Sequence, residues 1–504
     1  MPSFELLAVI CLVIFAFGDL VVGVVNDAIN FLNSAIGAKV TSRRVIMGVA
    51  AIGIIVGATF SDGIIEVARK GIFHPEFFSL NESIMLFAAV SISYIVLIDL
   101  FSTFGLPTST TVSIVFELLG AAFVLAWLKM GSFDEAWTVI NSSSAIRIIM
   151  GILFSVGIAF SAGLLGQFIS RILFTFNYKK RLKRWGFLWT GFALTCLLFF
   201  ILLKGGKHAT FMTANLQEWI STHTWLILEI SFLVFSLISF VLIKMRVNIL
   251  KIVILIGTGA LAMAFAGNDL ANFIGVSVAG VNAFLGADLS GTLPTPIWIL
   301  LLSGLVMASA LYFSKKAKTV AATEINLASH DKEVMNHWKS RGFLVKLTNL
   351  IIFIYDSFRK LVPKKIRRWI ASRWGITDQD HEGDHAFDLI RASVNLMVAA
   401  AVISFATSKK LPLSTTYVTF MVAMGTALAD RAWTRECAPS RIAGVLTVVG
   451  GWFVTAIMAF MIAGFTVTVL YFTKSAGLVA LVLLIVYIIY KLGHLHDKRS
   501  VKSA

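Results

Sequence analysis

The chain has 504 residues, of which 58% are hydrophobic and 14% are charged, with a mean hydropathy of +0.86 and a formal net charge of +16. A soluble domain cannot bury so much apolar surface, so the composition excludes a soluble globular protein and predicts an all-α polytopic membrane protein. The Lys and Arg residues lie between apolar runs and not in a stripe with aromatic residues, which excludes a nucleic-acid-binding surface.

Apolar runs of membrane-spanning length recur along the whole chain. Crossing the hydrocarbon core takes about 20 apolar residues in an α-helix. The sequence therefore predicts about 12 or 13 transmembrane helices. We expect the first to be retained, because it has no basic segment before it and no small-residue cleavage site after it. The expected spans are 4–25, 45–60, 82–101, 106–128, 144–170, 184–204, 223–243, 248–266, 296–314, 387–406, 411–430, 441–472 and 476–492.

Basic residues fall on alternate loops between these spans. By the positive-inside rule such loops are cytoplasmic, whereas loops poor in Lys and Arg, such as 131–143 and 281–295, lie outside. Arg69, Lys70 and the pair at 409–410 do not follow this alternation. The pattern predicts a multi-pass protein of the plasma (cell or inner) membrane. The cytoplasmic basic loops are 39–44, 171–184, 244–246, 315–386, 431–441 and 498–502.

The segment 315–386 is too polar to span a membrane. Between Arg341 and Arg373 it alternates apolar residues with Lys and Arg. This is typical of an amphipathic helix on an anionic leaflet, and a surface for a regulatory partner is the alternative. His381 and His385 lie four residues apart among acidic residues. We interpret that stretch as a solvated loop, with a metal site as the alternative.

Two short polar motifs each occur twice, in the same order along the chain. The pattern Asn-Asp-x-x-Asn-Phe occurs at 26–31 and returns at 268–273. The pattern Pro-x-Ser-Thr-Thr occurs at 107–111 and returns at 412–416. Two different motifs that recur in one order indicate an internal duplication.

The spacing of the motifs supports this duplication. A glycine follows each proline by 13 residues, at Gly120 and Gly425. The first residues of the two motifs are 81 residues apart in one copy and 144 in the other, and the difference of 63 is close to the length of the basic insertion. Five expected spans in each copy, joined by two more, require the copies to enter the membrane from opposite sides. Inverted repeats and broken or re-entrant helices at a central site are typical of secondary transporters.

The chain thus divides into six expected segments. They are a first inverted transmembrane repeat (1–170), connecting transmembrane helices (171–247), the first part of the second inverted repeat (248–314), a cytoplasmic basic amphipathic insertion (315–386), the second part of the second repeat (387–472), and a last transmembrane helix with a basic cytoplasmic tail (473–504).

The repeated Asn-Asp motif places an acidic residue at the end of an apolar span, once at Asp27 and once at Asp269. A carboxylate is costly in the bilayer and normally faces the protein interior or a water-filled cavity. Together with neighbouring Asn carbonyl oxygens it suits a small hard cation, with Na⁺ as the first reading and H⁺ as the second. An ordinary helix cap is the alternative. The expected cation ligands are Asp27, Asn30, Asp269 and Asn272.

The Pro-x-Ser-Thr-Thr motif predicts a helix that begins inside the membrane. Proline interrupts or starts a helix, and the new N-terminus offers hydroxyls and unpaired N–H groups that attract an anion. Two such termini would hold a tetrahedral oxyanion between them, whereas a plain Ser/Thr cap after a proline kink is the alternative. The expected anion ligands are Ser109, Thr110, Thr111, Ser414, Thr415, Thr416, Asn26 and Asn268.

Several other polar residues lie inside or beside the apolar spans. Glu117 has Val422 as its counterpart in the second copy, and it either tunes cation coupling or belongs to a buried polar pair. Asp99, Asp430 and Arg391 lie near span ends, where snorkelling or capping accounts for them.

The sequence contains no nucleophile–base constellation, metal motif or Gly-rich phosphate loop, so it predicts no enzyme, no cofactor and no metal beyond a transported cation. The three cysteines, Cys11, Cys196 and Cys437, are far apart and are expected to be packing residues.

These motifs resemble those of the PiT family of inorganic phosphate transporters, whose signature repeats Gly-Ala-Asn-Asp-x-Ala-Asn and Pro-x-Ser-Thr-Thr-His. Residues 266–272, Ala-Gly-Asn-Asp-Leu-Ala-Asn, match closely. The resemblance covers both repeats, and it implies that the Asn-Asp segments and the Ser-Thr-Thr helix ends line one site for phosphate and Na⁺ or H⁺. The first copy departs at Val24 and Val25, and the family's histidines are Val112 and Tyr417 here. Loss of both histidines favours Na⁺ coupling.

The resemblance implies a secondary active transporter that imports inorganic phosphate by Na⁺ symport, with H⁺ open as the coupling ion, and that alternates access around a site at mid-membrane. A sulfate or metal-phosphate transporter on the same scaffold is one alternative, and a passive anion channel or sensor is another. The expected partners are inorganic phosphate, Na⁺ or H⁺ and the lipid bilayer, with no nucleic acid and with a homo-oligomer left open.

Overall fold

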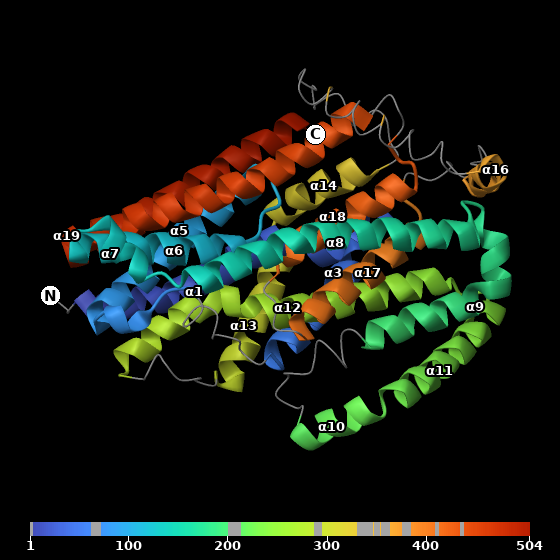
Figure 1. Ribbon diagram of the computed structural model, residues 1–504, viewed down its shortest axis with the longest axis horizontal. Helices are drawn as coiled ribbons and strands as arrows, with labels where there is room; N and C mark the ends of the chain where they lie inside the picture. Colours follow the sequence, from blue (N-terminus) through green and yellow to red (C-terminus); the bar gives the residue numbers. More distant parts are fainter. Residues whose placement is uncertain are drawn as a thin grey trace.

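The protein is a bundle of long helices (Figure 1), seen in a computed structural model that describes residues 4–61, 72–199, 213–286, 295–329, 346, 353, 363–374, 385–408, 413–433 and 438–503. Apart from one isolated bridge between Phe73 and Ile140, the regular structure of these residues is helical, which confirms the all-α class. Eight of the described helices are long and apolar enough to span a membrane, or nine if one bent pair counts as a span.

The helices of the first half are α1 (Phe4–Asp27), α2 (Ile29–Gly37), α3 (Arg43–Thr59), the 3-10 helix η1 (Pro75–Phe77), α5 (Leu80–Thr103), α6 (Thr110–Met130), α7 (Phe133–Thr138) and α8 (Ser142–Phe174). Then follow α9 (Tyr178–Leu197), α10 (Ala214–Thr222), α11 (Thr224–Lys244), α12 (Ile249–Phe284), α13 (Ile297–Phe313), α14 (Lys316–Ala328), α16 (Lys364–Arg373), α17 (Leu389–Ser408), α18 (Thr415–Ala429) and α19 (Ala438–Ser503).

Helix α19 contains the last two expected spans. Its backbone leaves the helical region at Lys474, where φ is 47° and ψ is −124°. The arms before and after this residue lie side by side in Figure 1. Arg441 in the first arm and His496 in the second both hydrogen-bond α14, so the chain turns back on itself at Lys474. The turn lies where the sequence separates 441–472 from 476–492.

Two pairs of helices form antiparallel hairpins around the repeated Pro motifs. In the first hairpin, α5 and α6, Lys129 near the end of α6 pairs with Glu82 near the start of α5 at 2.8 Å. In the second hairpin, α17 and α18, Arg391 near the start of α17 lies 3.9 Å from Asp430, which follows α18. The Ser-Thr-Thr segments begin α6 and α18, so they lie at the closed tips of the hairpins.

The two hairpins enter the bundle from opposite ends of α8. Before α8 begins, Asn141 donates its N–H to the carbonyl of Ile72, beside the open end of the first hairpin. Near the end of α8, Arg171 binds the open end of the second hairpin. A helix of 33 residues is about 50 Å long, so the open ends lie far apart. The sequence prediction of inverted repeats requires this arrangement, and the repeats themselves stay a prediction.

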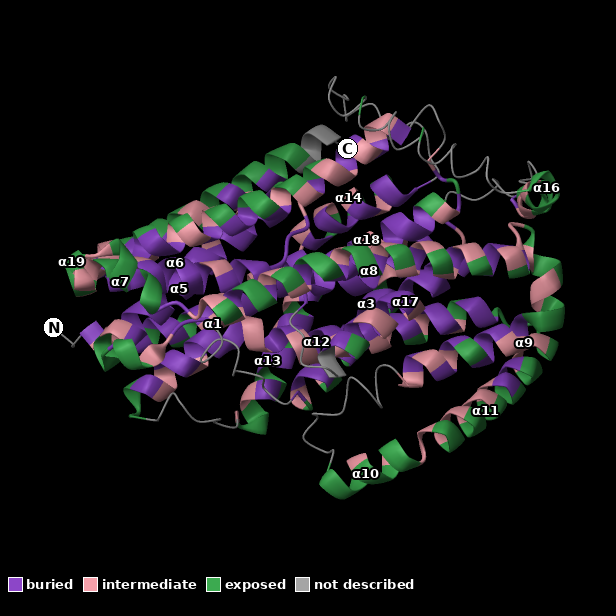
Figure 2. Ribbon diagram, in the orientation of Figure 1, coloured by how far each residue is buried: buried purple, intermediate pink, exposed green. Residues whose placement is uncertain are grey.

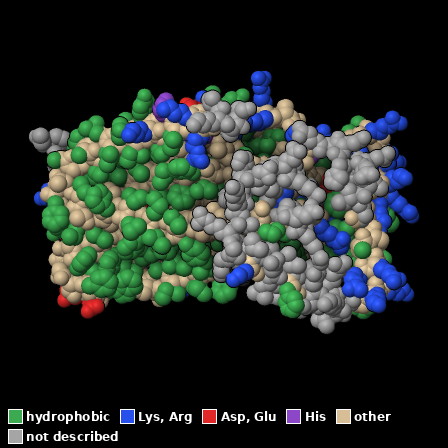
Figure 3. Space-filling model, turned by 90° about the horizontal axis from the view of Figure 1, so that it is seen from above, with side chains coloured by type: hydrophobic (Ala, Val, Ile, Leu, Met, Phe, Trp, Pro, Cys, Tyr) green, Lys and Arg blue, Asp and Glu red, His purple; other side chains and the backbone are tan. Residues whose placement is uncertain are grey.

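The surface agrees with a membrane protein that has one basic end. Figure 3 shows a wide band of hydrophobic side chains and, beyond it, Lys and Arg side chains gathered toward one end of the molecule. That end is the one where α9 begins and α16 lies in Figure 1. Figure 2 shows the exposed residues of α11 facing away from the bundle, and among the large apolar ones are Leu233 and Leu237. Lipid is the natural solvent for such a face.

The two glycines that follow the repeated prolines allow close helix packing. A Cβ at Gly120 would lie 2.2 Å from the carbonyl oxygen of Phe460 in α19. A Cβ at Gly425 would lie 2.2 Å from the carbonyl oxygen of Phe160 in α8. Small residues let helix backbones approach in this way inside membranes. Gly120 and Gly425 thus each let a hairpin helix pack closely on a long helix, α19 or α8.

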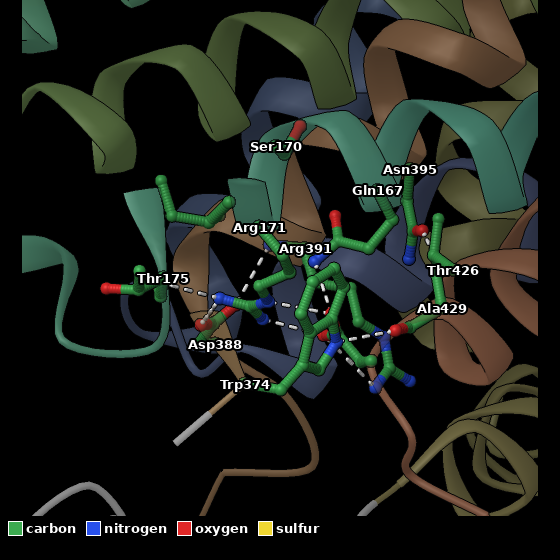
Figure 4. Close-up of polar contacts among 12 residues, drawn as sticks. Gln167, Ser170, Arg171, Thr175, Trp374, Asp388, Arg391, Asn395, Thr426 and Ala429 are labelled. Carbon is green, nitrogen blue, oxygen red and sulfur yellow. Dashed lines mark hydrogen bonds and ion pairs between the residues drawn. The ribbon is translucent and has the colours of Figure 1, made fainter. Parts of the chain in front are cut away.

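A buried ion-pair network joins α8 to the open end of the second hairpin (Figure 4). Arg171 binds Asp388 at 2.7 Å and Asp430 at 2.6 Å, and Gln167 donates to Asp430 at 2.7 Å. Arg391 is fully buried and also donates to the Ala328 carbonyl. Snorkelling at a span end therefore does not account for Arg391 or Asp430, because both side chains lie inside the protein and contact other helices.

Part of the expected insertion 315–386 packs into the bundle. Helix α14 follows α13 after a bend of 72°. Its Lys316 pairs with Asp99 at 2.6 Å, which explains that acidic residue by an ion pair. Trp374, just after the basic helix α16, donates to the Ala429 carbonyl at 2.8 Å. Most of 330–362 and 375–384, including His381, lies outside the described residues, so the amphipathic-helix and loop predictions stay predictions.

Candidate functional site

The two repeated aspartates lie in different local structures but are equally buried. Helix α1 ends at Asp27 and α2 begins at Ile29, so the first motif interrupts a helix. Asp269 lies within α12, which continues without a break from Ile249 to Phe284. Both carboxylates have no exposed surface. Ala28 occupies the cap position of α2 without a side-chain bond, and Asp269 is far from a helix start, so neither aspartate is a helix cap.

The two Ser-Thr-Thr segments begin their helices with nearly the same geometry. Ser109 has φ −97° and ψ 117°, and Ser414 has φ −95° and ψ 116°. Each serine hydroxyl accepts the N–H three residues ahead, from Val112 at 3.1 Å and from Tyr417 at 3.2 Å. The serines therefore cap α6 and α18, as N-cap residues commonly do. The N–H groups of the residues that follow have no partner within the helix.

The four threonines connect each aspartate to both helix ends. Asp27 accepts one hydrogen bond from Thr110 in its own half at 2.8 Å. It accepts another from Thr416 in the other half at 2.7 Å. Asp269 accepts from Thr415 in its own half at 2.7 Å and from Thr111 in the other half at 3.5 Å. This crosswise pattern brings the four repeated motifs together in one buried site.

Two asparagines complete the contacts between the halves. Asn30 donates to the hydroxyls of Thr415 and Thr416 at 3.1 and 3.2 Å. Asn272 donates to Thr111 at 2.9 Å and to Asp269 at 3.0 Å. The hydroxyls of Thr111, Thr415 and Thr416, which donate to the aspartates, thus also accept from an amide. The structure thus places Asn272 directly at Asp269, as predicted. It places Asn30 at the threonines that bind the two aspartates.

The remaining two asparagines of the predicted set differ in their surroundings. Asn268 donates to Asp269 at 3.2 Å and is partly exposed. Asn26 is fully buried and holds the tip of the first hairpin, because it donates to Ser102 at 2.9 Å and accepts from the Thr108 N–H at 3.1 Å. Asn26 therefore acts on the site indirectly, because it holds the loop that leads into the first Ser-Thr-Thr segment.

Thr419 is a site residue that the sequence prediction missed. Its hydroxyl donates to the side-chain oxygen of Asn30 at 3.1 Å, and this bond fixes the orientation of the Asn30 amide. The available signal was its spacing, since Thr419 comes four residues after Thr415 and so lies on the same face of α18. The pattern of the motif ended at Thr416 and did not point further along the helix.

The chemistry of this site combines negative charge with neutral donors. The hydrogen bonds described above reach the two carboxylates from hydroxyl and amide groups, which carry no charge. Buried carboxylates need a positive counter-charge, and two helix N-termini at the same place favour an anion. Within the described ranges no group of three or more His, Cys, Asp or Glu residues could hold a metal ion. The arrangement can therefore bind a small cation and an oxyanion next to each other.

Several known proteins are similar to this chain in sequence or in fold. Three archaeal relatives carry the provisional name phosphate permease: one from Thermococcus kodakarensis is 26% identical over 352 residues, one from Pyrococcus abyssi is 25% identical over 353 residues, and one from Pyrococcus furiosus is 25% identical over 352 residues. Each alignment covers 66% of this chain and 78 or 79% of the relative.

A solved structure titled the sodium-dependent phosphate transporter matches with a TM-score of 0.67 and 18% identity, over 92% of this chain and 99% of that chain. At this identity the likeness shows the shared fold alone. The profile of the phosphate transporter family matches residues 23–354, which include both Asn-Asp motifs and the first Ser-Thr-Thr motif. The chain therefore belongs to the phosphate transporter family.

Proposed function

We propose that this protein is a secondary active transporter that imports inorganic phosphate together with Na⁺ and alternates access around the site at Asp27 and Asp269. The single observation that carries the proposal is the crosswise bonding of these two buried aspartates to both Ser-Thr-Thr helix ends. A site made equally by two halves can open to either side when the halves rock against each other.

The cation part of the proposal rests on the aspartates and their amide neighbours. Two carboxylates with no exposed surface cannot stay charged in a low-dielectric interior without compensation. Carboxylate, amide and hydroxyl oxygens are hard ligands that suit Na⁺. We assign Asp27, Asn30, Asp269 and Asn272 to cation binding. The positions of the family's histidines hold Val112 and Tyr417, and Tyr417 stacks on Trp452 at 3.7 Å, so proton transfer through a histidine is not available there.

The phosphate part of the proposal rests on the two helix ends. Helix N-termini bind phosphate through unpaired N–H groups and the helix dipole. Bound Na⁺ ions would offset the repulsion between phosphate and the aspartates, so binding of the two solutes is coupled by electrostatics. We assign Ser109, Thr110, Thr111, Ser414, Thr415 and Thr416 to phosphate binding, with Asn268 beside them and Asn26 as the support of the first helix end.

The test is uptake of radiolabelled phosphate by proteoliposomes under an inward Na⁺ gradient, with choline in place of Na⁺ as the reference. We expect accumulation above equilibrium only with Na⁺. Asp27→Asn and Asp269→Asn should each reduce this uptake to near background with normal reconstitution, whereas Asp134→Asn, at an exposed position on α7, should not change it. Uptake that equilibrates without any gradient would indicate a passive channel and contradict the proposal.

The same assay separates the remaining alternatives. An excess of unlabelled phosphate should abolish the signal, and an equal excess of sulfate should leave most of it. Stronger competition by sulfate would instead assign the site to sulfate. Accumulation driven by a proton gradient in choline buffer would keep the transporter and replace Na⁺ by H⁺ as the coupling ion.

A further inference from the structure

A second buried acidic cluster lies away from the central site. Asp19 on α1 and Glu117 on α6 have 2% and 0% of their surface exposed. Ser91 on α5 hydrogen-bonds Asp19 and also contacts Ser277 on α12, with 3.4 Å between the two hydroxyl oxygens. Ser113 donates to Glu117 at 2.9 Å. Asp19 interacts electrostatically with Glu117, and Tyr94 interacts with both, so helices that also carry or support the central site bring carboxylates and hydroxyls near one another a second time.

Three polar atoms in this cluster have no partner among the described residues. They are one carboxylate oxygen of Asp19, one of Glu117 and the hydroxyl of Tyr94 on α5. Tyr94 is fully buried, and its hydroxyl lies beside α1, only 2.8 Å from where a Cβ would stand at Gly23. Gly23 is one turn from Asp19. Buried polar groups are almost always hydrogen-bonded, so these three unpartnered oxygens are available to a ligand.

The cluster is displaced from the central site toward the open end of the first hairpin. Asp19 precedes Asp27 by eight residues, and Glu117 follows Thr110 by seven. At 1.5 Å per residue these separations are about 10–12 Å along the helices. The positive-inside rule places the open end of the first hairpin on the outer side of the membrane. An ion that enters from that side would meet the cluster before it reaches Asp27.

The predicted repeat offers apolar counterparts of these two acids. When the two Asn-Asp motifs are aligned, Asp19 corresponds to Leu261, and when the two Ser-Thr-Thr motifs are aligned, Glu117 corresponds to Val422. Leu261 and Val422 are buried and apolar in the second half. The same positions can therefore be packed with hydrocarbon, and the two acids in the first half need an explanation other than packing.

We propose that Asp19 and Glu117, with the hydroxyls of Ser91, Ser113 and Tyr94, form a second Na⁺ site between the outside and the central site. This inference rests on the proposed function in one respect, that Na⁺ is the coupling ion. All the ligands are oxygens, as a hard monovalent cation requires. One Na⁺ leaves a single negative charge on the two carboxylates, which one shared proton neutralises. Because the second half has no equivalent site, this Na⁺ adds one ion to those bound at the aspartates.

The direct test is equilibrium binding of radioactive ²²Na⁺ to purified protein without phosphate, compared between the wild type, Asp19→Asn and Glu117→Gln. We expect each variant to bind one Na⁺ fewer per protein. The Hill coefficient for Na⁺ in phosphate uptake should fall by about one, while uptake at saturating Na⁺ remains measurable. The matched control is Glu82→Gln, an acid at the start of α5 that already pairs with Lys129 and should leave the Na⁺ count unchanged.

A second variant guards against misfolding. The double change Asp19→Leu with Glu117→Val copies the apolar pair of the second half, so we expect a folded protein that has lost the same single Na⁺. An unchanged Na⁺ count in the folded variants would overturn the proposal. If, in addition, Glu117→Gln lost an infrared band of a protonated carboxyl group, the cluster would be shown to hold protons and no Na⁺. Absence of gradient-driven uptake in the wild type would refute the proposed transport function, while the Na⁺ count would still decide on this site.

Discussion

At the scale of single residues, the hydroxyls of the repeated threonines carry the connection between the halves. Thr416 donates to Asp27 and accepts from Asn30, so one oxygen links the second helix end to both polar residues of the first half. A hydrogen bond to a charged group contributes about 1.5–3 kcal/mol, roughly twice that of a neutral pair. The hydroxyl is therefore more important here than the bulk of the side chain.

Replacement of Thr416 by valine tests this view, because valine keeps the shape and removes the hydroxyl. We expect Thr416→Val to weaken Na⁺-dependent phosphate uptake by about ten- to a hundredfold, which is the factor that about 1.5–3 kcal/mol produces. Thr416→Ser should retain most of the uptake. Thr59→Val is the control, since among the described residues that hydroxyl bonds the Ile55 carbonyl of its own helix. Equal uptake by wild type and Thr416→Val would show that the bond to Asp27 has no role in transport.

At the scale of helices, close backbone contacts and a buried ion-pair network hold the second hairpin. Gly425 lets α18 approach the backbone of α8, and Arg171 ties the end of α8 to the open end of the hairpin. Removing one partner of a buried ion pair leaves an uncompensated charge, so these contacts resist separation of α8 from α18. The hairpin is thus fixed at its middle and at its base, while its tip lies in the site.

Gly425→Ala should destabilise the protein by about 1–3 kcal/mol or more. The added methyl group would clash with the Phe160 carbonyl oxygen, and a backbone atom of a packed helix cannot rotate away as a side chain can. The expected observation is a lower melting temperature of the detergent-purified protein. Gly157→Ala on α8, the helix that Gly425 packs against, provides the control, since a Cβ there meets nothing within 4 Å. Alanine favours a helix over glycine, so this control should be neutral or slightly stabilising. Equal melting temperatures for the two variants would argue against tight packing at Gly425.

At the scale of the whole molecule, the direction of the two hairpins decides how the site is reached. Their tips meet at Asp27 and Asp269, and their open ends lie at opposite ends of α8. Under the proposed function, each hairpin would separate the site from one side of the membrane. A movement of one half against the other would open one route while the second hairpin keeps the other closed, which is what alternating access requires.

Cysteine labelling from one side of the membrane tests the orientation. In a background with Cys11, Cys196 and Cys437 replaced by serine, a membrane-impermeant thiol reagent applied to intact cells should label Asp134→Cys on α7. It should label Lys365→Cys on the basic helix α16 only after the membrane is made permeable. The reason is that basic segments stay on the cytoplasmic side. Labelling of both positions in intact cells, or the reverse pattern, would contradict the assigned orientation.

Much of the fold and of the site was predictable from the sequence, because lipid imposes strong local rules. Apolar runs must be helices of a set length, and polar residues inside them need a partner, so Asp27 and Asp269 were identifiable without a structure. The duplication added a second, independent signal, since motifs that recur in one order must occupy related positions. The expected snorkelling of Arg391 at a span end was wrong, because its position along a helix does not reveal which face of that helix the rest of the protein covers.

The sequence by itself determined that this is an all-helical membrane protein in which two polar motifs each occur twice. Only the tertiary structure decided that Thr416 reaches Asp27 across the halves, that α12 passes Asp269 without a break, and that Asp19 and Glu117 are both buried and interact electrostatically. The physical reason is one of range. Hydropathy and motif spacing act within a helix or between neighbours, whereas these contacts join residues far apart in the chain, and helix packing alone brings them together.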